Sequence, residues 1–204
     1  MSLRKFIVQQ FKRPNGLLGK LAGHIMANRS SNIERNRWML ELLELKRQDR
    51  VLEIGYGPGL AVEGALQRID KGLVMGIDHS ETMFKQASRR VASAIAQGRA
   101  KLLLGDIQEH PGFDMPFDHI YSANVVMFWK NPTAVFKYLK TILAPGGDVV
   151  TLYMPRNIDA ANEDGYKAGD EIANWLKQAG FANIRTEIKE FGAIAAVCVI
   201  ARNA

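Results

Sequence analysis

Short apolar runs alternate with amphipathic stretches from residue 51 almost to the end of the chain. Runs rich in Val, Ile and Leu are typical of buried strands, whereas apolar positions three and four residues apart are typical of helices. The runs interpreted as strands are residues 51–54, 73–77, 101–104, 119–122, 148–153, 183–190 and 195–201, and helices are expected at 60–69, 80–97, 132–143 and 162–179. This alternation predicts an α/β fold, with a largely parallel sheet and helices on both faces.

The last two predicted strands are joined by residues 191–194 alone. A parallel crossover needs a dozen or more residues, so these strands are expected to pair as an antiparallel hairpin at the edge of the sheet.

Three further helices are expected before the first strand. Residues 3–12 and 17–28 are separated by a Pro-Asn-Gly turn, and Ser31 followed by Glu34 has the spacing of a capping box that begins a helix running to about Leu45. We therefore divide the chain into an N-terminal helical cap or lid, residues 1–45, and an α/β domain, residues 46–204.

The composition is that of a globular protein: 204 residues with 47% hydrophobic and 24% charged side chains. The single cysteine, Cys198, excludes a disulfide framework and a multi-cysteine metal site, and no metal is expected. No apolar run approaches the roughly 18–20 residues that span a bilayer, and a cytoplasmic location is expected.

The positive net charge of +6 is concentrated at one end of the chain. The first 33 residues hold six basic and no acidic side chains, whereas the remainder is balanced. This distribution favours a local contact with an anionic substrate, a membrane surface or RNA over a basic stripe across the domain, and a solvated basic extension is the alternative.

A glycine-rich turn follows the first predicted strand, in the segment Glu53-Ile54-Gly55-Tyr56-Gly57-Pro58-Gly59. Glycines allow a tight turn and close approach of backbone to a ligand. The dinucleotide fingerprint requires Gly or Ala where this chain has Leu60, and the Gly-Lys-Ser/Thr of a nucleoside-triphosphate loop is absent. The turn therefore favours a different nucleoside-like ligand.

Two acidic residues stand at the ends of the second and third strands. Asp78 is placed to accept hydrogen bonds from ribose hydroxyls, and Asp106 to accept one from an adenine amine. Ligands of open α/β sheets bind at the carboxyl ends of the strands, so the turn and both acids are expected to converge on one molecule.

Together these motifs resemble those of class I S-adenosylmethionine-dependent methyltransferases over about residues 31–202. The resemblance rests on the glycine turn, Asp78, Gly105-Asp106-Ile107 and the Leu-Ala-Pro-Gly-Gly segment at 143–147. It implies a Rossmann-like doubly wound sheet of order 3-2-1-4-5-7-6 with strand 7 antiparallel, and S-adenosylmethionine as cofactor.

The resemblance also implies which residues contact the cofactor. The loop glycines would hold the methionine moiety, Asp78 the ribose, and Asp106 with Ile107 the adenine. The complete expected set is Glu53, Gly55, Tyr56, Gly57, Gly59, Asp78, His79, Asp106, Ile107 and Asn124.

Methyl transfer from a sulfonium needs mainly proximity and exclusion of water, and no catalytic base is assigned. The Asn/Asp-Pro-Pro-aromatic motif of nucleobase amine methyltransferases and a cysteine nucleophile near the fourth strand are both absent, which argues against nucleic acid as acceptor. Apolar residues after that strand are expected to line a substrate pocket instead. Its expected residues are Asn28, Arg29, Asn32, Trp38, Met127 and Trp129.

Three functions are compatible with this sequence. The first is methylation of a small-molecule acceptor, and the second is methylation of a lipid or quinone with residues 3–28 lying on a membrane. The third is a cofactor-binding protein without catalysis. The acceptor atom and the oligomeric state are not determined by the sequence.

Overall fold

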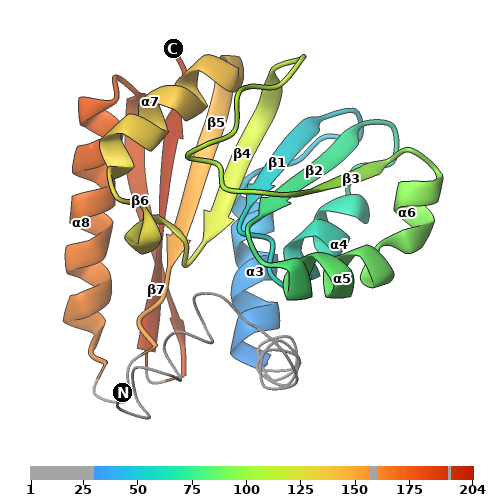
Figure 1. Cartoon of the computed structure of the whole chain (residues 1–204). Helices are drawn as coiled ribbons and strands as arrows, with labels where there is room; N and C mark the ends of the chain where they lie inside the picture. The colour runs from blue at the N-terminus through green and yellow to red at the C-terminus, as the bar shows by residue number, and fades with distance from the viewer. Residues whose placement is uncertain (1–29, 157–159, 193) are drawn as a thin grey trace, which may run out of the picture.

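A seven-stranded sheet lies between two layers of helices in the computed structural model, which describes residues 30–156, 160–192 and 194–204 (Figure 1). The strands are β1 (Arg50–Ile54), β2 (Leu73–Asp78), β3 (Ala100–Leu104), β4 (Phe117–Ala123), β5 (Leu143–Tyr153), β6 (Ala182–Phe191) and β7 (Ile194–Arg202). The helices are α3 (Ser30–Leu42), α4 (Leu60–Leu66), α5 (Glu81–Arg90), α6 (Ala92–Ala96), α7 (Pro132–Ile142) and α8 (Asn162–Gln178), with a short 3-10 helix, η1 (Val126–Phe128).

The strand order is β3-β2-β1-β4-β5-β7-β6. β1 to β5 pair with one another in parallel, whereas β7 is antiparallel to both β5 and β6. The sequence prediction of a doubly wound Rossmann-like sheet that ends in an antiparallel hairpin is therefore confirmed. The predicted helices at 3–12 and 17–28 lie outside the described residues, so the cap or lid at 1–45 stays a prediction apart from α3.

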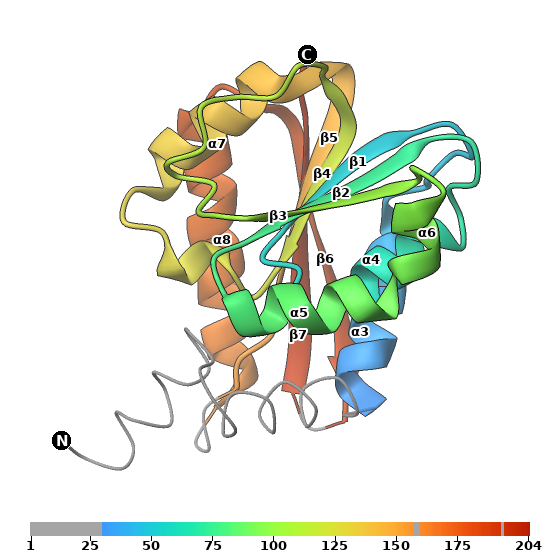
Figure 2. The ribbon, with the colours of Figure 1, turned by 45° about the vertical axis from the view of Figure 1, so that its right-hand side comes forward.

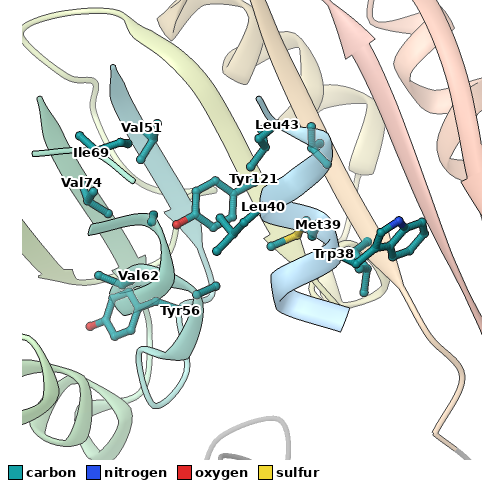
Figure 3. Packing of buried hydrophobic residues seen from close by; sticks show 14 of the residues in the cluster. Trp38, Met39, Leu40, Leu43, Val51, Tyr56, Val62, Ile69, Val74 and Tyr121 are labelled. Carbon is teal, nitrogen blue, oxygen red and sulfur yellow. The ribbon is translucent and has the colours of Figure 1, made fainter. Parts of the chain in front are cut away.

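The sheet separates two hydrophobic cores, as expected when helices cover both faces (Figure 2). The first core packs α3, α4, α5 and α6 against one face, and the second packs α7 and α8 against the other. Figure 3 shows how α3 enters the first core: Leu40 points toward Tyr121 of β4, and Trp38 lies on the opposite side of the helix. α3 thus joins the fold as a buried element and covers the sheet beside α4.

Two predicted elements differ from the structure. The helix expected over 80–97 is broken at Val91, whose backbone leaves the helical region (φ −108°, ψ 23°), and becomes α5 and α6. β5 begins at Leu143, earlier than predicted, because Leu143 pairs with Phe117 of β4, and because Gly146 and Gly147 exchange backbone hydrogen bonds with Asn203 in the C-terminal tail (2.6 and 2.9 Å). Both partners are distant in the sequence.

Candidate cofactor and acceptor site

The glycine turn after β1 lies at the carboxyl edge of the sheet. Gly55, Gly57 and Gly59 all have positive φ values (71°, 52° and 83°), a conformation that side chains disfavour. A Cβ at Gly55 would lie 2.5 Å from Val125, and one at Gly59 would lie 2.9 Å from Ala87. A Cβ at Gly57 would meet nothing within 4 Å, so the space beside this residue is open. Two glycines are thus required by packing, and the middle one leaves room for a ligand.

Asp78, at the end of β2, connects that strand to the glycine turn. Its Oδ2 accepts a hydrogen bond from the backbone N–H of Gly57 and its Oδ1 one from that of Ser80, both at 2.8 Å. Burial raises the pKa of the Asp78 carboxyl, while these two hydrogen bonds and the nearby His79 lower it in part. The carboxylate therefore lies directly beside the open space at Gly57.

Glu53 is buried beneath the same turn. Its Oε2 has no hydrogen-bond partner among the described residues, and the hydroxyl of Tyr121 has none either. Tyr121 lies close enough to influence the pKa of Glu53. Burial raises the pKa of Glu53 well above its ordinary value, and the negative charge of Asp78 raises it further. Two neighbouring acids thus share a poorly solvated region under the turn, where the charged form of Glu53 is disfavoured.

Tyr56 has a packing role that its place in the loop does not reveal. Its side chain is buried against Gly76 of β2, and its hydroxyl donates a hydrogen bond to the carbonyl of Leu103 at 3.1 Å. The side chain of this expected cofactor residue therefore packs against the sheet and supports the turn.

The end of β3 places the remaining expected nucleoside contacts. Asp106 is partly exposed, and its Oδ1 accepts a hydrogen bond from the backbone N–H of Gln108 at 2.9 Å. Ile107 is buried in the second core, and His79 is exposed directly after Asp78. Asp106 and Asp78 thus end two neighbouring strands, as predicted, on the side of β1 away from β4.

Asn124 ends β4 with a strained backbone (φ 56°) and a fully engaged side chain. Its Nδ2 donates to the carbonyl of Met154 (2.8 Å), and its Oδ1 accepts from the N–H of Met154 (3.0 Å) and from Nη1 of Arg35 (3.2 Å). The side chain joins the ends of β4 and β5 to helix α3.

The residues expected to line a substrate pocket are not all brought together. Trp38 lies in the first core, with its ring 5.8 Å from that of Phe191, whereas Trp129 lies in the second core against Phe136 (5.3 Å). The two tryptophans therefore contribute to opposite faces of the sheet. Met127 is exposed on η1, Asn32 is buried on α3, and Asn28 and Arg29 lie outside the described residues.

Arg35 is the residue at this edge that the sequence analysis missed. It is only 5% exposed, and it stands three and four residues before the buried Trp38 and Met39 on α3. A charged residue on the apolar stripe of a helix is the signal that would have found it.

Comparison with known proteins identifies the family. Residues 51–147 match the family described as methyltransferase domain. The uncharacterized methyltransferase YdaC of Bacillus subtilis is 32% identical over 182 residues, which cover 89% of this chain and 97% of that protein. This chain belongs to the class I S-adenosylmethionine-dependent methyltransferases.

Other members share more distant likenesses. Trans-aconitate 2-methyltransferase of Variovorax paradoxus is 32% identical over 164 residues, covering 78% of this chain and 60% of that enzyme. A solved S-adenosylmethionine-dependent methyltransferase from Aquifex aeolicus has the same fold, with a TM-score of 0.73 at 20% identity, covering 91% of this chain and 98% of that one.

The carboxyl edge of this methyltransferase fits the cofactor of its family, S-adenosylmethionine. The open space at Gly57 allows close approach of a ligand to the backbone, and the carboxylates of Asp78 and Asp106 provide hydrogen-bond acceptors for hydroxyl and amine groups. The described residues contain no cluster of His, Cys, Asp and Glu suited to a metal ion and no helix long and apolar enough to cross a membrane.

Proposed function

We propose that this methyltransferase acts on a small-molecule acceptor that binds over the ends of β4 and β5. The ends of β1, β2 and β3 carry the glycine turn and the two acids, so the nucleoside part of the cofactor extends toward β3. Since β4 and β5 follow β1 on the other side, the acceptor approaches from there. The observation that carries the proposal is the hydrogen bond from the backbone N–H of Gly57 to the Asp78 carboxylate, beside the open space at Gly57.

The bound cofactor supplies a methyl group on a positively charged sulfur, which leaves as a neutral thioether. The residues of the chain bind, orient and exclude water, which together can contribute roughly 7–11 kcal/mol to lowering the barrier. The Asp78 carboxylate beside the turn offers hydrogen-bond acceptors to the cofactor, and α3 covers one side of the site. No described side chain is assigned as a general base.

The named relatives support a small acceptor, because trans-aconitate 2-methyltransferase carries the name of a small tricarboxylic acid. The test has two steps. Isothermal titration calorimetry with S-adenosylhomocysteine should show binding to the wild type and weaker binding to Asp78→Ala. Incubation with methyl-labelled cofactor and a panel of small molecules that includes trans-aconitate should then label at least one of them. Absence of S-adenosylhomocysteine binding would refute the proposal.

A further inference from the structure

β6 forms one edge of the seven-stranded sheet, and its outer side pairs with no strand of the described residues (Figure 1). It is ten residues long, whereas β3, at the opposite edge, has five. The pairing of β6 with β7 is regular over residues 185–191. Proteins commonly keep an edge strand short or interrupt it with a bulge, because its unpaired backbone groups invite pairing with another chain. The long regular stretch of β6 therefore offers a template for a further strand.

The side chains of this stretch carry both signs of charge in alternation. Arg185, Glu187 and Lys189 share one face of β6, because residues two apart on a strand point to the same side. Nε of Arg185 lies 3.7 Å from Oε1 of Glu187, and Nζ of Lys189 lies 5.7 Å from the centre of the Phe191 ring. On the other face Ile188 is 53% exposed, and no large apolar side chain of the described chain is more exposed. Lysines alone would protect an edge from pairing, so the alternation and the exposed isoleucine need a different explanation.

A two-fold axis through Ile188 brings each of these side chains opposite a complementary one. An axis perpendicular to the sheet keeps every side chain on its own face, so residues opposite each other are an even number of positions apart. When Ile188 lies opposite its copy, Glu187 lies opposite Lys189 of the second copy, and Lys189 opposite Glu187. Arg185 then lies opposite Phe191, a pair suited to a cation–π contact. Cross-strand pairs of this kind stabilise antiparallel sheets.

The neighbouring registers lack this complementarity. An axis at Glu187 places that residue opposite itself and Arg185 opposite Lys189, and an axis at Lys189 places two lysines opposite each other. Like charges directly opposite are destabilising. An axis at Thr186 opposes Arg185 to Glu187, but it pairs the copies across the irregularity at the start of β6. Only the register centred on Ile188 uses the whole regular stretch and opposes unlike charges within it.

We propose that two copies of this chain associate through β6, antiparallel about Ile188, so that their sheets become continuous. Helix α8 packs over the face of β7 and β6 and not against the outer edge: a Cβ at Gly169 would lie 3.5 Å from Val197 and 3.7 Å from Thr186. Two-fold dimers are the commonest assemblies of identical chains. One strand pair buries less area than a permanent interface does, so the dimer should form in the micromolar range. The inference does not depend on the methyl acceptor.

Sedimentation velocity of the full chain from about 5 to about 200 µM measures the association. The wild type should show a monomer–dimer equilibrium. Ile188→Asp places two carboxylates at the axis and should raise the dimer Kd at least about tenfold without changing the melting temperature. Ile33→Asp is the matched control, because Ile33 is a similarly exposed isoleucine on α3 (50%), and it should dimerise like the wild type. A wild type that stays monomeric throughout, or a dimer that Ile188→Asp leaves intact, would overturn the proposal.

Charge reversal tests the register. Glu187→Lys and Lys189→Glu each place like charges opposite one another in a homodimer, so each variant alone should be largely monomeric. An equimolar mixture of the two variants restores both pairs of unlike charge and should form a heterodimer, as should the double variant with itself. An axis at Thr186 predicts no such rescue, because Glu187 would then lie opposite Arg185. Two single variants that dimerise normally, or a mixture that stays monomeric, would overturn the proposal.

Discussion

The carboxylate of Asp78 accepts a hydrogen bond from the backbone N–H of Gly57 at 2.8 Å, and so fixes the glycine turn after β1 to the end of β2. One side chain thereby shapes the turn and stands at its open side, where a ribose hydroxyl would compete for the same oxygen. We expect this residue both to position the loop and to bind the ligand.

Asp78→Ala should weaken the binding of S-adenosylhomocysteine by about 1.5–3 kcal/mol, because charged hydrogen bonds to the ligand are lost. It should also lower stability, since the N–H groups of Gly57 and Ser80 lose their acceptor. Calorimetry and thermal unfolding measure the two effects. The control is Asp70→Ala, which removes an exposed carboxylate paired with Arg47. A loss of stability without a loss of affinity would leave Asp78 as a structural cap.

Gly57→Ala should reduce the affinity for the cofactor by more than the backbone strain of alanine alone would. A left-handed conformation costs alanine about 1–2 kcal/mol in stability, and here the added methyl group also enters open space at the site. Gly98→Ala is the matched control, because Gly98 also has a positive φ (71°) and open space around it, but lies beyond α6. Both variants should lose similar stability, and only Gly57→Ala should bind S-adenosylhomocysteine less tightly; equal affinities would contradict this prediction.

Glu53→Gln should stabilise the ligand-free protein at neutral pH, because glutamine cannot ionise and so avoids the cost of a buried carboxylate charge. Because the pKa of Glu53 is raised in the folded state, the folded protein holds this proton more tightly than the unfolded chain. Stability is therefore lost as pH rises above the ordinary value of 4.5, and the variant should lack this loss. Melting temperatures from pH 4 to pH 8 test it; parallel curves for the two proteins would show that Glu53 does not titrate in this way.

Asn124→Ala should lower stability by about 2–4 kcal/mol. It removes the hydrogen bonds to Met154 and Arg35 and leaves alanine in a left-handed conformation. Asn131→Ala is a milder comparison, since Asn131 only caps α7 through Ala134 (3.0 Å) and such a cap contributes about 1 kcal/mol. Urea unfolding distinguishes them, and equal losses would mean that the Asn124 bridge adds little.

Deletion of residues 1–29 should leave a folded protein that binds cofactor but transfers methyl far more slowly. The described residues already build two cores on the faces of a complete sheet, so the deleted segment is expected to serve the reaction through substrate positioning and water exclusion. Cooperative melting, calorimetry and turnover of the labelled acceptor measure the three properties. Aggregation would assign these residues to the fold, and full activity would contradict a role as cover.

Much of the fold was predictable, because β1 to β5 contain apolar runs that are mostly separated by clear helix signals. Asn131 followed by Pro132 is one such signal, and it begins α7 as the sequence indicates. The break at Val91 and the early start of β5 were not predictable, since no local residue marks the first and the second depends on the distant Asn203.

The site was predictable in its backbone more than in its side chains. The glycine turn and Asp78 meet as expected, because parallel strands end at one edge. The directions of Tyr56 and Trp129 were not predictable, since an aromatic residue in a loop gives no periodicity to show which face it joins. Arg35 was missed because helical propensity treats arginine as an ordinary surface residue.

The bridge made by Asn124 has a consequence for how such a protein diversifies. Its backbone N–H donates a hydrogen bond to the carbonyl of Leu152, and its side-chain amide forms two with the backbone of Met154. The hydrogen bonding between β4 and β5 therefore continues one residue beyond their last main-chain pair. The segment that follows, from Val125 to Trp129, carries none of this pairing. Val126 and Trp129 are held in the second core, whereas Met127 and Phe128 are exposed, so these two positions can change their chemistry by small steps while the sheet and its core stay intact.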